Sequence, residues 1–278
     1  MSAYKRWLFE NDDIRPYVYM RPENRPQKPG RVHDFEFPDK TLFIDPLALE
    51  NADFATMLLA LENTAFKTTG LTLPRWALYD CHALPGLTCG FVHRTRSLPD
   101  SIRKVMPIIE TCEWTPLSLF IAIPAVEGNH WVACNLCSVN SLLPREKNYS
   151  CLGFLSKAFG LWYSNIENLY GVTQWSNQAL TVHTSFGLFE LVTAYTPVHN
   201  IPASLTYRAA VDSELWHRFI ETRDQWVNPL KPAGFDVNPA DDATLIGLHK
   251  RIRNGEGPFF LNPDAEYKNS ARIPIYTR

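Results

Sequence analysis

The sequence predicts an α/β protein whose sheet is mixed, mostly antiparallel and flanked by helices. Dense apolar periodicity, alternating between helical and strand spacing, occupies residues 41–226 of the 278-residue chain. Hairpin signals at residues 85–86 and 127–129 indicate antiparallel pairing. Residues 175–188, WSNQALTVHTSFGL, lie between two β-prone runs, so a short helix there gives the order strand, helix, strand. Together these patterns favour a sheet with helices packed on it.

The apolar runs place the other elements. Residues 40–47 are expected to form a short strand, and Asn51 or Asp53 caps the following helix, with Glu62 outside its apolar face. Later helices are expected at residues 99–106, 151–163 and 213–226. Strands are expected in two hairpins and a final group, at residues 76–84 with 87–95, 117–125 with 130–140, and 168–174, 189–196 and 204–211.

Residues 175–188 allow two structures. In the first, Ser176 caps a short helix that carries His183 on its apolar face and ends at Gly187. In the second, residues 179–186 form a strand that turns at Gly187, which makes a β-meander. The spacing supports the helix, whereas the β-branched composition supports the strand. The elements on either side favour the helix.

Composition limits the classes of function. The chain is 45% hydrophobic and carries a net charge of −2, with a pI near 6.4. This charge argues against nucleic acid or anionic membrane as a partner, because such binding needs clustered Lys and Arg. No run approaches the ~18 apolar residues of a membrane span, and the N-terminus lacks the apolar core of a signal peptide. We therefore expect a cytoplasmic protein.

Three regions are expected along the chain. Residues 1–40 carry five prolines among charged residues, which predicts an extended arm without a core of its own. Residues 41–226 form the expected core domain. Residues 227–278 are rich in Pro and Gly, with only residues 243–252 typical of a helix, and form a second arm. Arms with aromatic anchors commonly pack on their own domain or on a symmetry mate, so a homodimer is compatible with this organisation.

The six cysteines are interpreted as buried thiols, because they lie mostly inside apolar runs and are too few for a disulfide scaffold. Cys134 and Cys137 have the CxxC spacing, with His130 just before them. A zinc site would need a second pair of ligands at comparable spacing, and a redox motif would begin a helix, whereas this stretch alternates like a strand. No metal site is therefore predicted.

The order of elements over residues 41–211 resembles the GNAT superfamily of acyl-CoA-dependent N-acyltransferases. That order is strand, helix, hairpin strands, long strand, polar loop, helix, strand, short helix and two strands. The family often carries Asn, Ala, an aliphatic residue, Tyr and Gly at a fixed spacing, which this chain keeps as Ser176, Ala179, Leu180, His183 and Gly187. The resemblance implies transfer of an acyl group from acyl-CoA or an acyl-carrier protein to a small amine.

The same resemblance implies a carrier site. A pantetheine arm is a chain of amides that can bind beside a strand, here through the residues Asn135, Cys137 and Val139. Pyrophosphate is best held at a helix N-terminus, where NYSCLG provides Asn148, Cys151 and Gly153, and Ser176 completes the set of expected carrier contacts. The family has glycine where this chain has Cys151, and Arg145 and Lys147 compensate by charge.

For catalysis, the resemblance assigns His183 to protonate the leaving thiolate, because it occupies the position of the family's tyrosine. Glu127 or His130 is expected to act as the base, with Asp80 and His82 as alternatives. The absent tyrosine and the absent loop glycine favour a second hypothesis. In that hypothesis the chain is a degenerate, non-catalytic domain for binding or dimerisation.

A weaker resemblance is to acetoacetate decarboxylase-like proteins. Residues 92–107, VHRTRSLPDSIRKVMP, are similar to a segment near the start of that family, and residues 168–196 would form a meander in a β-rich barrel. The catalytic lysine would fall at Tyr163 or Ser164, so this resemblance implies a small-molecule-binding protein without Schiff-base chemistry.

Overall fold

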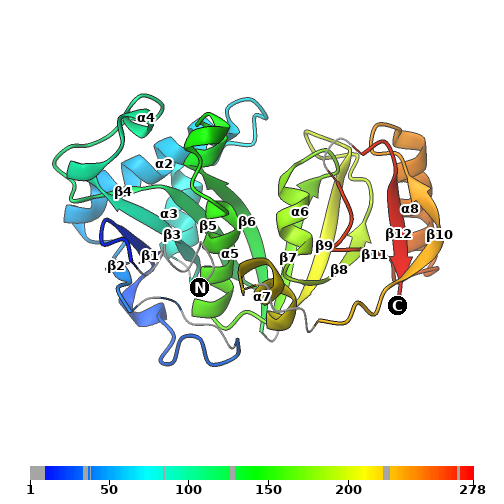
Figure 1. Cartoon of the computed structure of the whole chain (residues 1–278). Coiled ribbons are helices and arrows are strands. Elements are labelled where there is room, and N and C mark those ends of the chain that lie inside the picture. Colours follow the sequence, from blue (N-terminus) through cyan, green and yellow to red (C-terminus); the bar gives the residue numbers. More distant parts are fainter. Residues whose placement is uncertain are drawn as a thin grey trace. The chain divides into compact units, whose positions relative to one another are not determined.

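The structure is a computed structural model that describes residues 10–33, 37, 39–83, 85–125, 129–221, 226–267 and 270–278, with only the backbone for residues 82, 83 and 221. The chain divides into two compact units (Figure 1). Unit 1 comprises residues 1–126 and 133–166, and unit 2 comprises residues 127–132 and 167–278. This division passes through the range 41–226 that we expected to be one core domain.

Unit 1 contains a mostly antiparallel sheet. Its strands lie in the order β2-β1-β3-β5-β6, with β4 beside β3. The β1–β2 pair is parallel, and β3 pairs antiparallel with β1, β4 and β5. The strands are β1 (Ile14–Tyr19), β2 (Leu42–Ile44), β3 (Leu87–Arg94), β4 (Trp114–Pro116), β5 (Ser118–Pro124) and β6 (His130–Ser138), of which residues 133–138 belong to this unit.

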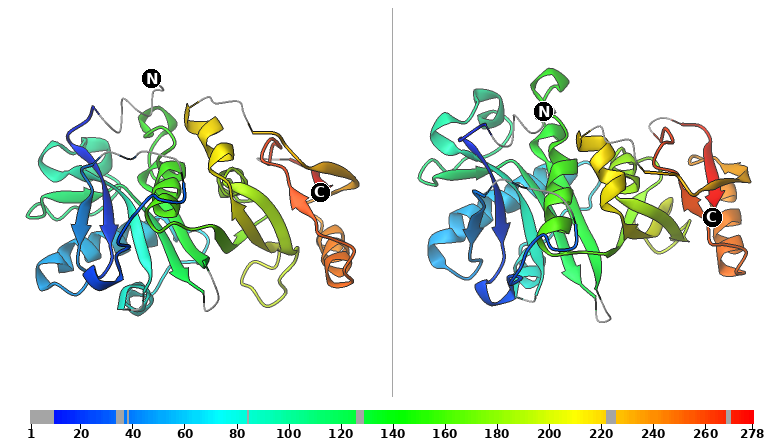
Figure 2. Two further views of the ribbon diagram at one scale, coloured as in Figure 1. Left: turned by 90° about the horizontal axis from the view of Figure 1, so that it is seen from below. Right: turned by 60° about the horizontal axis from the view of Figure 1, so that its bottom comes forward.

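Helices cover both faces of this sheet (Figure 2). Tyr17 of β1 lies 5.3 Å from Phe54 of α2, measured between ring centroids, and Phe91 of β3 lies 6.2 Å from Phe159 of α5. Tyr17 is opposite Gly90 in the register, so it shares a face with Gly90 and not with Phe91. The α-helices are α2 (Ala52–Phe66), α3 (Arg75–Ala83), α4 (Asp100–Arg103) and α5 (Leu152–Tyr163). The connecting segments contain the short 3-10 helices η1 (Pro22–Asn24), η2 (Leu49–Asn51), η3 (Thr95–Ser97), η4 (Val139–Ser141) and η5 (Arg145–Lys147).

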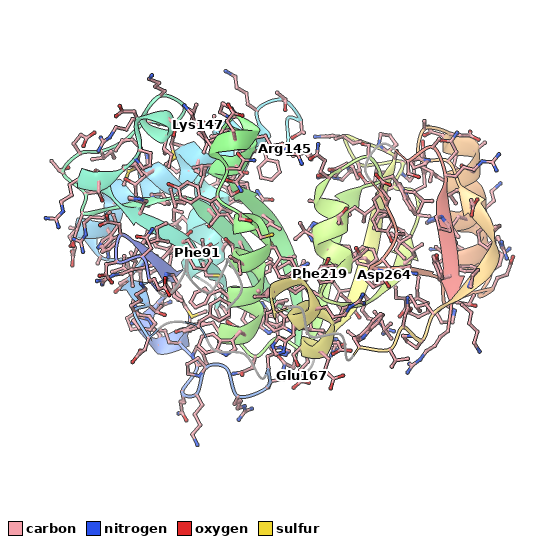
Figure 3. All side chains as sticks on the ribbon, viewed as in Figure 1. Phe91, Arg145, Lys147, Glu167, Phe219 and Asp264 are labelled. Carbon is pink, nitrogen blue, oxygen red and sulfur yellow. The ribbon has the colours of Figure 1, made fainter. Side chains whose placement is uncertain are left out.

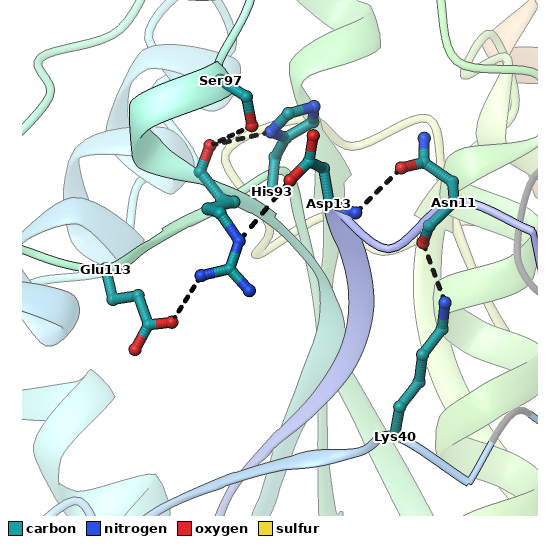
Figure 4. A network of polar contacts seen from close by, with 7 residues as sticks. Asn11, Asp13, Lys40, His93, Ser97 and Glu113 are labelled. Carbon is teal, nitrogen blue, oxygen red and sulfur yellow. Dashed lines mark hydrogen bonds and ion pairs between the residues drawn. The ribbon is translucent and has the colours of Figure 1, made fainter.

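Strand β1 lies in the interior of the sheet, although residues 1–40 were expected to form an arm. Its apolar side chains are buried, and β1 pairs with both β2 and β3. A polar network anchors the residues before it (Figure 4): Arg94 forms ion pairs with Glu113 (2.7 Å) and Asp13 (3.5 Å), and Lys40 donates to the carbonyl of Asn11 at 2.8 Å. The prolines of this region therefore indicated an extended arm where the chain forms an apolar strand.

The predicted strand at residues 76–84 is wrong, because residues 75–83 form helix α3. The carbonyl of Pro74 accepts hydrogen bonds from the backbone N–H groups of Ala77 and Leu78, which starts the helix. Leu78 is buried, whereas Trp76 is 67% exposed, so two residues that would share one face of a strand have different environments. The first predicted hairpin is therefore wrong, and β3 pairs with β1 and β5 instead.

The second predicted hairpin corresponds to β5 and β6, which are neighbours in the sheet. Of its predicted turn, residues 127–129, only Asn129 is among the described residues, so the predicted base Glu127 lies outside them. The helices predicted at residues 151–163 and 213–226 correspond to α5 and to α7, and α7 is described as far as Glu221.

Unit 2 contains an antiparallel sheet in the order β7-β9-β8-β11-β12-β10, with residues 130–132 of β6 beside β7. Among the described residues the sheets are open, so the alternative of a closed barrel is wrong. The elements are β7 (Asn168–Gln174), α6 (Ala179–Thr184), β8 (Gly187–Thr193), β9 (Ser204–Val211), α7 (Ser213–Glu221), β10 (Lys231–Val237), α8 (Asp242–Arg253), β11 (Phe260–Leu261) and β12 (Ile273–Thr277).

Helix α6 settles the ambiguity of residues 175–188 in favour of strand, helix, strand. Asn177, and not Ser176, makes the side-chain bond at the start of the helix: its side-chain oxygen accepts from the backbone N–H of Ala179, the first helical residue, at 2.9 Å. The hydroxyl groups of Thr184 and Ser185 donate to carbonyls one turn earlier, at 3.1 and 2.7 Å. These bonds satisfy the polar groups of residues that are otherwise poor helix formers.

The region 227–278 contributes three strands and helix α8 to unit 2. The predicted helix at residues 243–252 is confirmed as α8, and Asp241 caps it by accepting from the N–H of Ala243 at 3.0 Å. The expected arm is part of a core: Leu245 and Leu248 of α8 pack in one buried cluster with Phe189 of β8 and Ile273 of β12. None of the helices in the described ranges combines the length and the hydropathy that crossing a bilayer requires.

Candidate functional site

The segment between β6 and α5 is a polar, basic loop at the start of a helix. Asn140 holds it by two bonds: its amide nitrogen donates to the carbonyl of Tyr149 at 2.6 Å, and its oxygen accepts from the N–H of Tyr149 at 2.9 Å. Arg145 and Lys147 are exposed in this segment (Figure 3). Such a loop presents positive charge next to a helix N-terminus, which is a favourable place for an anion.

Cys151 precedes α5 in a left-handed backbone conformation, with φ of 54°. This region of φ favours glycine, and Cys151 stands where the resembled family has glycine. Gly153 lies in the first turn of α5, and a Cβ placed on it would meet no described atom within 4 Å beyond its chain neighbours and the nearby helix backbone, so there is open space beside this turn. Asn148 and Cys151 are exposed.

The other predicted carrier residues differ in accessibility. Asn135 is half-buried, whereas the side chains of Cys137 and Val139 are buried. The backbone N–H of Val139 donates to the carbonyl of Leu117 at 2.8 Å. A carrier that bound along this stretch would therefore contact Asn135 and backbone groups rather than the side chains of Cys137 and Val139.

The cysteines do not all match the prediction of buried thiols. Cys89 and Cys137 are buried, and burial raises the pKa of both thiols well above the ordinary value. Cys134 and Cys151 are exposed. Cys134 hydrogen-bonds with the thiol of Cys81 on α3, and this bond lowers the pKa of Cys81. Because α3 was expected to be a strand, this contact could not be anticipated.

Glu62 is a functional candidate that the sequence placed outside the apolar face of its helix. The residue is only 1% exposed, and one carboxylate oxygen accepts from the N–H of Leu73 at 2.9 Å and from the amide of Asn135 at 2.6 Å. The other oxygen, Oε2, is buried without a hydrogen bond from the described residues. Burial raises the pKa of Glu62 from 4.5 to about 7, so this carboxyl can take up or release a proton near neutral pH.

In unit 2, four side chains form a row across one face of the sheet, which we call the polar row. The ring of His130 lies 5.8 Å from that of Tyr170, Arg208 donates a hydrogen bond to the hydroxyl of Tyr170, and Arg208 forms an ion pair with Glu190. The register places Arg208 directly opposite Tyr170 on β7 and Glu190 on β8, so these side chains share a face.

His183 lies on the opposite face of the same sheet. It is 8% exposed, and its Nδ1 is 3.4 Å from the hydroxyl of Tyr207, the residue next to Arg208 in β9. Successive residues of a strand point to opposite faces, so the structure does not bring the two predicted catalytic histidines, His130 and His183, together. Ser176 is exposed after the end of β7. Asp80 lies on α3, and the side chain of His82 is outside the described residues.

We expect Tyr207→Phe to lower the free energy of unfolding by about 1 kcal/mol, because the substitution removes the hydrogen bond with His183 from a buried site. Urea unfolding measures the change. Tyr195→Phe is the matched control, since the Tyr195 hydroxyl donates to Asp242 at an exposed site, and its effect should stay within a few tenths of a kcal/mol. Equal effects of the two substitutions would contradict a structural role for the His183–Tyr207 contact.

No group of three or more His, Cys, Asp or Glu side chains in the described part of the chain is arranged to hold a metal ion.

Neither the protein-family models nor the curated proteins contain a match to this chain. Among solved structures, the chain is similar to a provisionally assigned acyl-CoA N-acyltransferase from Klebsiella pneumoniae, at 13% identity and a TM-score of 0.33. The match covers 60% of this chain and 93% of that protein.

Proposed function

We propose that the protein transfers an acyl group from acyl-CoA, or from an acyl-carrier protein, to a small amine. The observation that carries this proposal is the order of elements, in which β2, α2, β3, β5, β6, a basic loop, α5, β7, α6, β8 and β9 occur in this sequence, with α3 before β3 and with α4 and β4 between β3 and β5. From β6 to β9 this order agrees with the one on which the resemblance to the GNAT superfamily rests, whereas the strand expected at residues 76–84 is helix α3. The conformation of Cys151 supports the same assignment of the loop.

In the proposed carrier site, the phosphates lie at the start of α5, near Asn148, Cys151 and Gly153. The positive end of the helix and the charges of Arg145 and Lys147 attract them. The amides of the pantetheine arm pair with backbone groups near Asn135, whose side chain contacts Glu62 at 2.6 Å. Ser176, the other residue of the predicted carrier set, belongs to unit 2.

The proposed chemistry needs three proton transfers. The acceptor ammonium gives one proton to a base, and the free amine attacks the thioester carbonyl. The nitrogen of the resulting tetrahedral intermediate loses a second proton, and its C–S bond breaks. The thiolate that leaves must then gain a proton. Glu62 and His130 are the candidate bases, Glu62 because its pKa is raised to about 7. His183 remains the proposed acid only with a base other than His130, because the two histidines lie on opposite faces of the sheet.

Binding of the carrier tests the proposal directly. Acetyl-CoA, longer acyl-CoAs and an acylated carrier protein should each be added to the full chain, and the free energy of unfolding measured. A carrier at 100 times its Kd should stabilise the protein by about 2.7 kcal/mol. The double substitution Arg145→Ala, Lys147→Ala should weaken this effect, whereas Lys250→Ala on α8 should not. No stabilisation by any thioester would remove the acyltransferase proposal.

A second candidate function is a non-catalytic domain that retains the carrier site for binding or dimerisation. The observation that favours it is Cys151, whose side chain lies where the family has glycine and narrows the approach of a phosphate. This alternative predicts that acyl-CoA stabilises the protein while no panel of small amines is acylated. Cys151→Gly should then tighten binding of acyl-CoA without producing transfer.

A further inference from the structure

Unit 2 contains a cavity of about 600 Å³ on the face of its sheet that carries the polar row. The floor is formed by residues of β8 and β9, including Leu188, Glu190 and Arg208, and the walls by Ile252 at the end of α8 and by Phe260 of β11. Cavities that bind small molecules commonly measure about 300–1,000 Å³ and combine apolar walls with a few polar groups. This cavity has both properties.

The register explains why charged and apolar groups meet there. Glu190 lies opposite Arg208 on one side and opposite Phe260 on the other, so Phe260, Glu190 and Arg208 form one row across three strands. The next row on the same face holds Leu188 opposite Ala210. An apolar surface therefore adjoins an ion pair, with both parts exposed to the cavity.

The ion pair has unused capacity for a ligand. The guanidinium of Arg208 is 46% exposed and bonds Glu190 through Nη2, while the carboxylate of Glu190 is 24% exposed and uses Oε2 in this pair. A guanidinium has five N–H donors and a carboxylate has two oxygens, so each group can bind a second partner of opposite charge.

The ligand that matches this pair best is a zwitterion. Arg278 also lines the cavity, so its charged side chains are two guanidiniums and the carboxylate of Glu190. An amine alone would be repelled by the guanidiniums, and a carboxylate alone would be repelled by Glu190, whereas adjacent ammonium and carboxylate groups can contact Glu190 and Arg208 together. The apolar neighbours Leu188, Ile252 and Phe260 then favour an apolar substituent between them. This combination of groups is that of an apolar α-amino acid.

We propose that the cavity binds an apolar α-amino acid, with its carboxylate on Arg208, its ammonium on Glu190 and its side chain against Leu188, Ile252 and Phe260. The proposal goes beyond the proposed function and does not rest on it, because the cavity is lined by residues of unit 2 alone. Binding itself requires no acyl donor.

Binding of three probes of similar size to the full chain tests the proposal: L-leucine, 4-methylpentanoate without the amine, and 3-methylbutylamine without the carboxylate. Calorimetry in the absence of acyl-CoA should give a Kd for L-leucine at least tenfold lower than for either of the other two. If 4-methylpentanoate or 3-methylbutylamine binds as tightly as L-leucine, or if L-leucine does not bind, the proposal is overturned.

Two substitutions locate the site. Arg208→Gln and Glu190→Gln should each weaken binding of L-leucine at least tenfold, and Arg253→Gln, at an exposed position of α8 that does not line the cavity, should leave it unchanged. The melting temperature of each variant shows whether it is folded, as we expect for an ion pair exposed to solvent. If L-leucine binds Arg208→Gln and Glu190→Gln as tightly as it binds the unmodified chain, the assignment of the binding site to this cavity is wrong.

Acyl transfer is measured separately, from acetyl-CoA to L-leucine and to amines without a carboxylate. If L-leucine binds as expected and no amine is acylated, the acyltransferase proposal fails while the binding site stands. If amines are acylated while L-leucine does not bind, the binding site fails while the acyltransferase proposal stands.

Discussion

Gly187→Ala should lower the free energy of unfolding by at least about 3 kcal/mol, as expected for a clash that side-chain movement cannot relieve. A Cβ at residue 187 would lie 1.8 Å from the carbonyl oxygen of Ala210 and 3.1 Å from the Cα of Val211. Both atoms belong to the backbone of β9, which pairs with β8 at this point. Relief would require the two strands to separate at the first residue of β8. Urea unfolding, followed by circular dichroism, measures the loss.

Gly247→Ala is the matched control, because the same substitution is made in the same unit. Residue 247 lies in α8, and an added Cβ would meet no atom of the described residues within 4 Å. Alanine is the better helix former, so this variant should gain about 0.5–1 kcal/mol. If Gly187→Ala were as stable as Gly247→Ala, the close pairing of β8 and β9 would be wrong.

The free energy of unfolding of Glu62→Gln should exceed that of the unmodified chain by an amount that grows as the pH rises. In the folded protein the pKa of Glu62 is raised to about 7 from its ordinary value of 4.5, because burial disfavours the carboxylate. Below pH 4.5 the group is protonated in both states and no stability is lost. Between these two values the unfolded state releases its proton first, so stability falls as the pH rises, and the loss is complete above pH 7. We expect this loss to be about 2 kcal/mol.

The measurement is the difference in free energy of unfolding between Glu62→Gln and the unmodified chain at pH 5 and at pH 8. Most of the 2 kcal/mol change should appear between these conditions, because the variant lacks the titrating group. Glu50→Gln, in the exposed turn before α2, should show no such change. A difference that does not vary with pH would mean that Glu62 is charged in the folded protein throughout this range.

Glu62→Gln also tests whether Glu62 is the base of the proposed reaction. If Glu62 accepts the proton of the ammonium, Glu62→Gln should slow acyl transfer by about 10²-fold or more and abolish a dependence of the rate on a group with a pKa near 7. If transfer is unchanged and His130→Gln slows it instead, the base lies in the polar row of unit 2.

The helix α6 and the helix α3 illustrate what the sequence can and cannot predict. The apolar spacing of residues 179–184, with glycine at residue 187, predicts α6 correctly, even though its β-branched residues favour a strand. Residues 75–83 form α3, but their aromatic and apolar residues also fit strand alternation, and a run this short does not separate the two patterns. The prolines around β1 likewise predict an arm, whereas these residues form a strand that is buried because it pairs with β2 and β3.

The candidate sites were less predictable than the elements because they depend on contacts between distant residues. Glu62 lies four residues after Leu58, next to the buried face of α2, and its partner Asn135 is 73 positions away. Arg208 and Glu190 are neighbours only because of the register between β8 and β9, which apolar alternation does not fix along the chain. The sequence indicates His183 as an acid from its position in the resembled motif and His130 as a base from its place at a hairpin. The structure adds that the two side chains lie on opposite faces of the sheet.

The position of β12 has a consequence for biosynthesis. This strand, residues 273–277, lies between β10 and β11 in the sheet, although it follows both in the sequence. When a nascent chain has emerged from the ribosome as far as β11, strand β10 has no partner, because β12 has not yet emerged. The apolar residues of β12, Ile273 and Ile275, are also still missing from the core cluster. Unit 2 cannot complete its sheet until residue 277 has been released. Until then, exposed strand edges leave it open to association with other chains.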